Sequence, residues 1–304
     1  MKTNRMARNK KIFSICFLSP AFILYTVFII LPILGTLYYS MTKWNMVTDA
    51  KFIEFDNFIY LYTRDSSFST VLKNTFSCIA ICLLFEIPLA TIFAFLVYRV
   101  KRGFRFFQSV YFVPAIISSA VVGLMYSLLF NTELGPINDL LNVIGLGGLR
   151  QNWLSDPNIV LYTVIAPTVW QMIGYYLVII LAAMQSISEE VIESAIIDGA
   201  NSIHLFFQIV VPLVKNIIQV CVVLCITGSL KYFDIPYMMT WGGPGVRSTF
   251  LSIYMYKQAF NENRFGRACA VSVNLAMIAL IATVLVNLIF NIGEKRQGRY
   301  KERI

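Results

Sequence analysis

The sequence predicts an all-α protein that crosses a membrane several times. Of its 304 residues, 58% are hydrophobic and only 13% are charged, whereas soluble domains carry about 25% charged residues. The mean hydropathy is +0.69. The apolar residues also come in long runs, and a run of roughly 18 or more residues is long enough to cross about 30 Å of hydrocarbon as a helix.

Six apolar runs predict six transmembrane helices. The first follows a basic N-terminus as a signal peptide would, but it continues from Ile12 to about Leu37, which is too long for a signal-peptide core. We therefore interpret it as a retained first span. Prolines inside several runs indicate kinks, which membrane helices tolerate where neighbouring groups bind the freed carbonyls. The predicted spans are 12–38, 71–98, 106–130, 159–183, 209–231 and 268–291.

The placement of the basic residues predicts the orientation. Lysines and arginines cluster in the tails, 1–11 and 292–304, and in the 99–105 loop, while the 131–158 loop holds only Arg150. Because basic loops stay on the cytoplasmic side, both termini are predicted to be cytoplasmic, and loops 42–69 and 232–267 external. The net charge of +9 is explained by these lipid-facing clusters. No nucleic-acid reading motif accompanies them, so no nucleic-acid partner is expected.

One cytoplasmic loop departs from this rule. Residues 184–208 contain no Lys or Arg but hold four acidic residues. Ser186 and Glu189 fit a capping box, Gly199 suits a helix stop, and Ser202 is placed to cap a second helix. A short amphipathic helix of this kind can seat in a groove on a partner protein or lie on the membrane. Its acidic character suits anionic lipid poorly, which favours a protein partner. The acidic residues are Glu189, Glu190, Glu193 and Asp198.

In this loop the sequence resembles the permease subunits of binding-protein-dependent ABC importers. Their pattern is Glu-Ala-Ala, three residues, Gly, nine residues and Ile-x-Leu-Pro, and here it occurs as Glu193-Ser194-Ala195, Gly199 and Ile209-Val210-Val211-Pro212. Every interval matches, with Ser194 and Val211 as departures. The resemblance covers about residues 12–291 and is closest to the sugar-permease branch, through segments such as Trp153-Leu154-Ser155-Asp156-Pro157 and Gly242-Gly243-Pro244.

The resemblance implies a type I importer transmembrane domain over 70–291, preceded by a first helix and external loop over 12–69. Residues 188–204 would form the coupling helix that docks on the ATPase, with Glu190, Glu193, Ala195, Asp198, Gly199 and Pro212 as its coupling residues. The implied partners are a second homologous permease, two ATPase subunits or domains, an extracytoplasmic solute-binding protein and membrane lipid. The implied function is carbohydrate import across the bacterial inner membrane.

No feature of the sequence indicates an enzyme. There is no Gly-x4-Gly-Lys-Ser/Thr phosphate loop, no Ser/His/Asp arrangement and no metal-ligand spacing around the six cysteines, which we interpret as packing residues. We therefore expect this chain to have no catalytic residue and to bind no metal or cofactor, with ATP and Mg²⁺ held by the partner ATPase.

A translocated solute needs polar groups inside the apolar bundle. On the fifth span Cys225, Ser229 and Tyr232 share one face, with Lys231 and Asp234 at its rim. The resemblance adds further substrate-path candidates at Ser119, Gly174 and Tyr175. For each of these residues, a hydrogen bond or contact that holds the helices together is an equally good interpretation.

Glu86 supports an alternative function. It stands inside the second predicted span, where an acidic residue costs several kcal/mol unless it faces a partner or water. An ion-coupled secondary transporter would use such a residue as a relay. A structural acid with a hydrogen-bonding partner is the simpler interpretation, because no second intramembrane acid or base accompanies Glu86.

Overall fold

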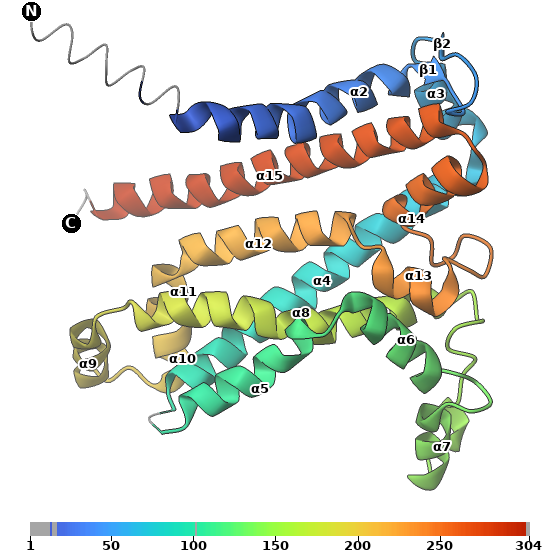
Figure 1. Cartoon of the computed structure of the whole chain (residues 1–304). Helices are drawn as coiled ribbons and strands as arrows, with labels where there is room; N and C mark the ends of the chain where they lie inside the picture. The colour runs from blue at the N-terminus through green and yellow to red at the C-terminus, as the bar shows by residue number, and fades with distance from the viewer. Residues whose placement is uncertain (1–12, 14–16, 101, 302–304) are drawn as a thin grey trace, which may run out of the picture. The chain divides into compact units, whose positions relative to one another are not determined.

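The computed structural model describes residues 13, 17–100 and 102–301, with side chains as far as residue 290. It confirms the all-α class (Figure 1), since the only strands in this part of the chain are the short antiparallel pair Thr42–Lys43 (β1) and Lys51–Phe52 (β2). The basic tail predicted over 1–11 and Cys16 lie outside the described residues, as do the side chains of the tail over 292–301.

The chain divides into two compact units. The first consists of residues 1–64 and 255–274, and the second of residues 65–254 and 275–304. The first unit holds η1 (Thr26–Ile30), α2 (Leu31–Ser40), β1, β2, α3 (Asp56–Ile59), η2 (Tyr60–Arg64) and η5 (Lys257–Asn261). The division predicted from the sequence, with a boundary near residue 70, remains a prediction.

The second unit contains most of the helices. In chain order these are α4 (Ser66–Tyr98), α5 (Phe104–Ile116), α6 (Ser119–Leu129), α7 (Pro136–Val143), η3 (Gly147–Leu149), α8 (Val160–Gln185), α9 (Glu189–Ile197), α10 (Ser202–His204), η4 (Leu205–Val210), α11 (Val211–Leu213), α12 (Lys215–Leu230) and α13 (Asp234–Thr240). Helices α14 (Leu251–Tyr256) and α15 (Phe265–Lys301) pass from one unit into the other.

Within the described residues, five helical segments are long and apolar enough to cross a membrane, and a sixth span results if one bent pair is counted. They begin and end close to the predicted positions for the first, second, fourth and sixth spans. The five are Phe17–Ser40, Ser66–Tyr98, Val160–Gln185, Lys215–Thr240 and Phe265–Phe290.

The third span is broken, which the sequence prediction of a continuous helix over 106–130 did not anticipate. Helices α5 and α6 meet at an angle of 87°. Pro114 has no N–H to continue the ladder, and Ile117 and Ser118 then adopt extended ψ angles of 135° and 131°. The side-chain amide of Gln171 on α8 donates to the carbonyl of Ile117 at 2.7 Å. A buried side chain thus binds a carbonyl that the break sets free.

The fifth span begins later than predicted. A start at residue 209 is wrong, because Leu205–Val210 forms a π-helical segment and Val214 leaves helical geometry, with ψ near 8°. The membrane-length segment starts at Lys215. The residues before it form a separate short apolar helix, Ser202–Leu213.

In the loop over 232–267, apolar and aromatic residues recur at near-helical spacing from Phe250 to Phe260, which predicts a helix at the membrane interface. A helix is present there as α14 and η5. We expected its apolar residues to lie at the membrane interface. Instead Phe250, Leu251 and Ile253 are fully buried by protein. The backbone N–H of Leu251 also donates to the Thr75 hydroxyl of α4 at 3.0 Å, so packing accounts for the apolar pattern.

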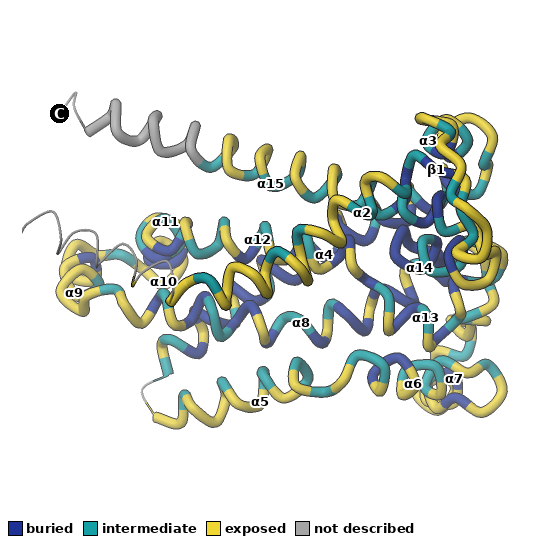
Figure 2. The backbone as a smooth tube through the Cα atoms, turned by 45° about the horizontal axis from the view of Figure 1, so that its top comes forward, coloured by how far each residue is buried: buried dark blue, intermediate teal, exposed yellow. Residues whose placement is uncertain are grey.

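The core of the second unit is centred on α8, which packs against α4 and α5, while α12 packs against α4. Figure 2 shows that buried residues occur along the whole length of α8. Residues 275–286 of α15 cover Ile79, Ile226 and Leu230 of α4 and α12. A cavity with polar side chains in its lining lies among these helices.

Candidate functional sites: a buried polar cavity and an exposed acidic loop

A cavity of about 180 Å³ lies within the second unit, among α4, α6, α8, α12 and the start of α13. One buried water needs only about 15 Å³ of such space, so the cavity can hold part of a solute. Four predicted substrate-path residues line it, namely Ser119, Cys225, Ser229 and Tyr232. The exposed side chains of Lys231 and Asp234 line its rim, as the sequence indicated.

Glu86 also lines this cavity. It is 2% exposed, and the Cys225 thiol donates to its Oε2 at 3.4 Å. The salt bridges of the described residues include no cation paired with Glu86. The sequence marked Glu86 as unusual but did not place it with Cys225, because the two residues lie on different helices.

Gln171 is a buried polar residue of this cavity that the sequence did not indicate as a candidate. It is 1% exposed, and its amide nitrogen donates a hydrogen bond to the Ile117 carbonyl at the helix break. Its carbonyl oxygen Oε1 is buried and accepts no hydrogen bond in the described structure. Together with Glu86 it gives the cavity two acceptors that a ligand rich in donors can satisfy. The one signal in the sequence is that this polar residue lies inside an apolar run.

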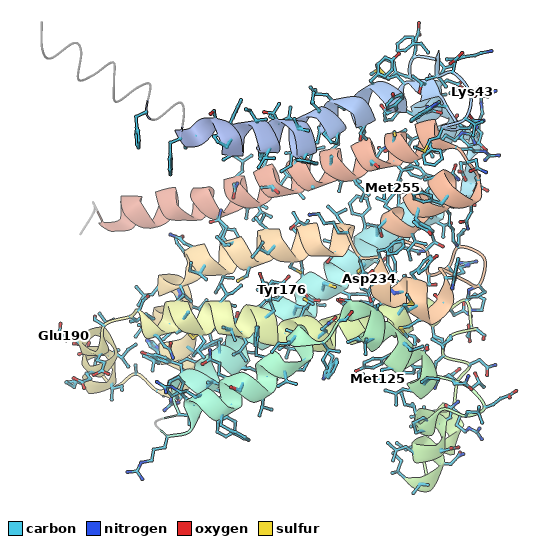
Figure 3. The ribbon with its side chains drawn as sticks, viewed as in Figure 1. Lys43, Met125, Tyr176, Glu190, Asp234 and Met255 are labelled. Carbon is cyan, nitrogen blue, oxygen red and sulfur yellow. The ribbon has the colours of Figure 1, made fainter. Side chains whose placement is uncertain are left out.

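Two of the predicted side chains, Ser229 and Tyr232, donate hydrogen bonds to backbone carbonyls. The Ser229 hydroxyl donates to the Cys225 carbonyl at 2.8 Å, and the Tyr232 hydroxyl donates to the Val164 carbonyl of α8 at 2.5 Å. Tyr232 lies two residues beyond the end of α12 but still faces α8. Figure 3 shows Tyr176 and Asp234, two other lining residues, on α8 and α13.

Gly174 and Tyr175, the other two predicted substrate-path residues, do not line this cavity. A methyl group at Gly174 would lie 1.8 Å from the carbonyl oxygen of Tyr111, so glycine allows α8 to approach the backbone of α5. Tyr175 is 40% exposed, and its neighbour Tyr176 faces the cavity instead. A substrate role for Gly174 and Tyr175 remains a prediction.

The acidic loop forms α9, a turn and the start of the α10–α11 segment. Gly199 has a φ of +86°, its N–H donates to the Ile196 carbonyl at 3.0 Å, and the Ala200 N–H donates to the Ala195 carbonyl at 2.9 Å. These two bonds form a Schellman motif, in which glycine adopts the left-handed conformation at low cost. The predicted helix stop at Gly199 is confirmed.

The predicted caps of this loop are wrong. The Ser186 hydroxyl donates to the Ala183 carbonyl at the end of α8 and does not cap α9, whose N-cap is Ser188. The second helix is capped by Asn201, which accepts from the His204 N–H at 2.8 Å, and not by Ser202. Ser202 instead accepts a hydrogen bond from Arg99, at the end of α4. Sequence spacing cannot foresee that competing tertiary contact.

The outer surface of the loop combines acidic and apolar side chains. Glu190, Glu193 and Asp198 are exposed, and the sticks of Figure 3 show Glu190 on α9. Ile197 is 84% exposed, and Ile196, Ile203 and Phe207 are also exposed. An open groove lies beside Glu190, Ala195, Asp198 and Gly199, whereas Glu193 and Pro212 do not line it.

Buried apolar residues at the C-terminal end of the loop pack against α4. Leu205 and Phe206 are buried, and the Phe206 ring lies 5.0 Å from that of Phe95 on α4. This contact and the Arg99–Ser202 hydrogen bond join the loop to α4. Exposed apolar groups on a fixed base are typical of a surface that binds protein.

Comparison with known proteins places this architecture in one family. Residues 86–299 match the family described as binding-protein-dependent transport system inner membrane component. The chain is 32% identical, over 95% of its length and 100% of the relative, to the probable ABC transporter permease protein YurN of Bacillus subtilis. It is 30% identical, over 90% of its length and 92% of the relative, to the probable starch degradation products transport system permease protein AmyD of Thermoanaerobacterium thermosulfurigenes.

The fold has a match among solved structures. A chain of the bacterial alginate ABC transporter, solved in complex with an alginate pentasaccharide-bound periplasmic protein, superposes with a TM-score of 0.80 at 23% identity, covering 94% of this chain and 96% of that one. This protein belongs to the binding-protein-dependent ABC importer permeases. It is a multi-pass, non-enzymatic subunit of the inner membrane, and this membership decides against the ion-coupled secondary transporter that Glu86 suggested.

Proposed function

We propose that this permease translocates a carbohydrate that an extracytoplasmic solute-binding protein delivers. The cavity carries this proposal, because it offers the Glu86 carboxylate, the unpaired Gln171 carbonyl and hydroxyls from Ser119 and Ser229. A sugar presents many hydroxyl donors around an apolar ring face. The aromatic side chains of Tyr176 and Tyr232 in the same wall suit that ring face.

The charged residues of the cavity indicate which class of carbohydrate it can accept. Glu86 is buried, and the hydrogen-bond donors beside it among the described residues are the thiols of Cys82 and Cys225. Of the charged residues that line the cavity, Glu86 and Asp234 are acidic and only Lys231 is basic, so an anionic cargo would find no excess of positive charge there. The proposed cargo is therefore a neutral oligosaccharide or disaccharide. Relatives with sugar-related names, such as AmyD, support this class, while the alginate importer carries an acidic polysaccharide.

The acidic loop is the proposed site for the ATPase. Glu190, Glu193, Ala195, Asp198, Gly199 and Pro212 remain the coupling residues of this proposal. ATP and Mg²⁺ would bind to two ATPase subunits or domains, and a second homologous permease would complete the translocation path. Closure of the ATPase pair would move α9, and the contact of Phe206 with Phe95 would transmit that movement to α4.

The cargo proposal is tested by reconstituting the assembled importer with its binding protein in liposomes that contain ATP. We expect uptake of a neutral oligosaccharide such as a maltodextrin, and no uptake of a uronate oligomer of equal length or of an amino acid. Preferential uptake of the uronate oligomer or the amino acid contradicts the neutral-carbohydrate assignment.

A further inference from the structure

The first unit contains a second cavity, which the proposed import function does not use. It has a volume of about 250 Å³ and is bounded by the β1–β2 hairpin, α3 and the beginning of α15. Four charged side chains line it, namely Lys43, Asp56, Arg264 and Arg267. Three of them are positive and one is negative.

The charges around this cavity are not balanced. Arg264 pairs with Glu262 at 2.5 Å, and Asp56 lies 4.0 Å from Arg64. Lys43 has no ion pair within the described residues. Arg267 stacks its guanidinium 3.5 Å from the centre of the Tyr60 ring, and its Nη1 is buried without a hydrogen-bond partner in that part of the chain. The walls therefore hold two positive charges that no carboxylate neutralises.

The cavity is preformed by close backbone packing. A methyl group at Gly266 would lie 1.9 Å from the carbonyl oxygen of Thr42. The Asn57 amide donates to the carbonyls of Ser40 and Thr42, both at 2.8 Å. These contacts fix the hairpin against the first turn of α15. The cationic side chains are therefore held on a rigid base, which lowers the entropic cost of binding.

The cavity lies beside the ends of two candidate membrane spans, where a span meets water. One apolar span ends at Ser40 and another begins at Phe265, and the lining residues Thr42 and Gly266 follow each of these ends closely. Tyr39 and Trp44 stack at 4.1 Å beside it. Aromatic residues of this kind gather at the level of phospholipid headgroups.

We propose that this cavity binds the phosphate group of a phospholipid headgroup. A phosphate oxygen would accept hydrogen bonds from Arg267 and Lys43, the two uncompensated cations. A free phosphate ester offers the same chemistry, but the position of the cavity beside two span ends and the Tyr39–Trp44 pair favours the lipid.

The test is native mass spectrometry of the intact importer in detergent, supplied in separate arms with phosphatidylglycerol or with inorganic phosphate. Lys43 is exposed, so Lys43→Gln removes one charge without disturbing the core. Its matched control is Lys51→Gln, because Lys51 lies opposite Lys43 in the hairpin but does not line the cavity. Arg267→Lys keeps a cation above Tyr60 but loses the planar fork.

We expect wild type and Lys51→Gln to retain phosphatidylglycerol equally, and Lys43→Gln and Arg267→Lys to retain about fivefold less. Equal retention by all four proteins overturns the proposal. Binding of inorganic phosphate without retention of lipid overturns the lipid as the source. A variant that loses affinity for the binding protein but keeps the lipid assigns the cavity to a protein carboxylate, which also overturns it.

Discussion

Gly199→Trp is expected to abolish ATP-driven uptake while the permease is still inserted in the membrane at the wild-type level. No atom lies within 4 Å of the position that a Cβ would occupy at Gly199, so a large side chain there extends into open space beside α9. It fills the groove that the proposed ATPase contact requires. The measurement is uptake in proteoliposomes together with co-purification of the ATPase subunit.

The control for this prediction is Gly199→Asn. Because Gly199 has a φ of +86°, any side chain there carries a backbone cost of about 1–2 kcal/mol, which asparagine tolerates best. We expect the asparagine variant to retain most uptake, since it leaves the groove largely open. Normal uptake and normal ATPase retention in the tryptophan variant would show that this surface binds no ATPase.

Glu86→Gln is expected to reduce the uptake of a neutral oligosaccharide about tenfold. The substitution keeps the size of the side chain and its place beside Cys225 but replaces one carboxyl oxygen by an amide NH2 group, which cannot accept a hydrogen bond. A buried polar group left without its partner costs about 1–3 kcal/mol, and 1.4 kcal/mol corresponds to a factor of ten. The measurement is the initial rate of uptake at a saturating concentration of loaded binding protein.

Thr91→Val is the matched control for Glu86→Gln. Thr91 is a buried polar residue of the same helix, donates to the Ile87 carbonyl at 2.7 Å and does not line the cavity. We expect it to leave the uptake rate within about twofold of wild type. Equal rates in wild type, Glu86→Gln and Thr91→Val would remove Glu86 from the translocation path.

The sequence was sufficient for the fold class, for most of the spans and for the helix stop at Gly199. These features depend on local composition and on backbone conformation, which a single chain encodes directly. The break between α5 and α6 was missed, because Pro114 indicates a kink but not its angle. At the break, Gln171 of α8 binds the Ile117 carbonyl, a contact between two helices that the sequence of one helix does not reveal.

The same limit explains what was missed in the candidate sites. Spacing along α12 indicated Cys225 and Ser229, but the pairing of Cys225 with Glu86 joins residues 139 positions apart. Gly174 was predicted as a contact for solute, and the approach of Tyr111 that demands a glycine there is visible only in three dimensions. The caps at Ser186 and Ser202 were likewise decided by tertiary contacts that compete for each hydroxyl.

Photo-cross-linking from Ile197 tests the coupling role of α9 most directly. Ile197 is 84% exposed on α9, so Ile197→Cys can carry a thiol-linked photoreactive group with little effect on folding. Leu134→Cys, at a site 86% exposed in the loop predicted to be external, is the control. We predict a cross-link to the ATPase subunit from position 197 and none from position 134. ATPase cross-links from position 134 alone, or from neither position, would contradict the account.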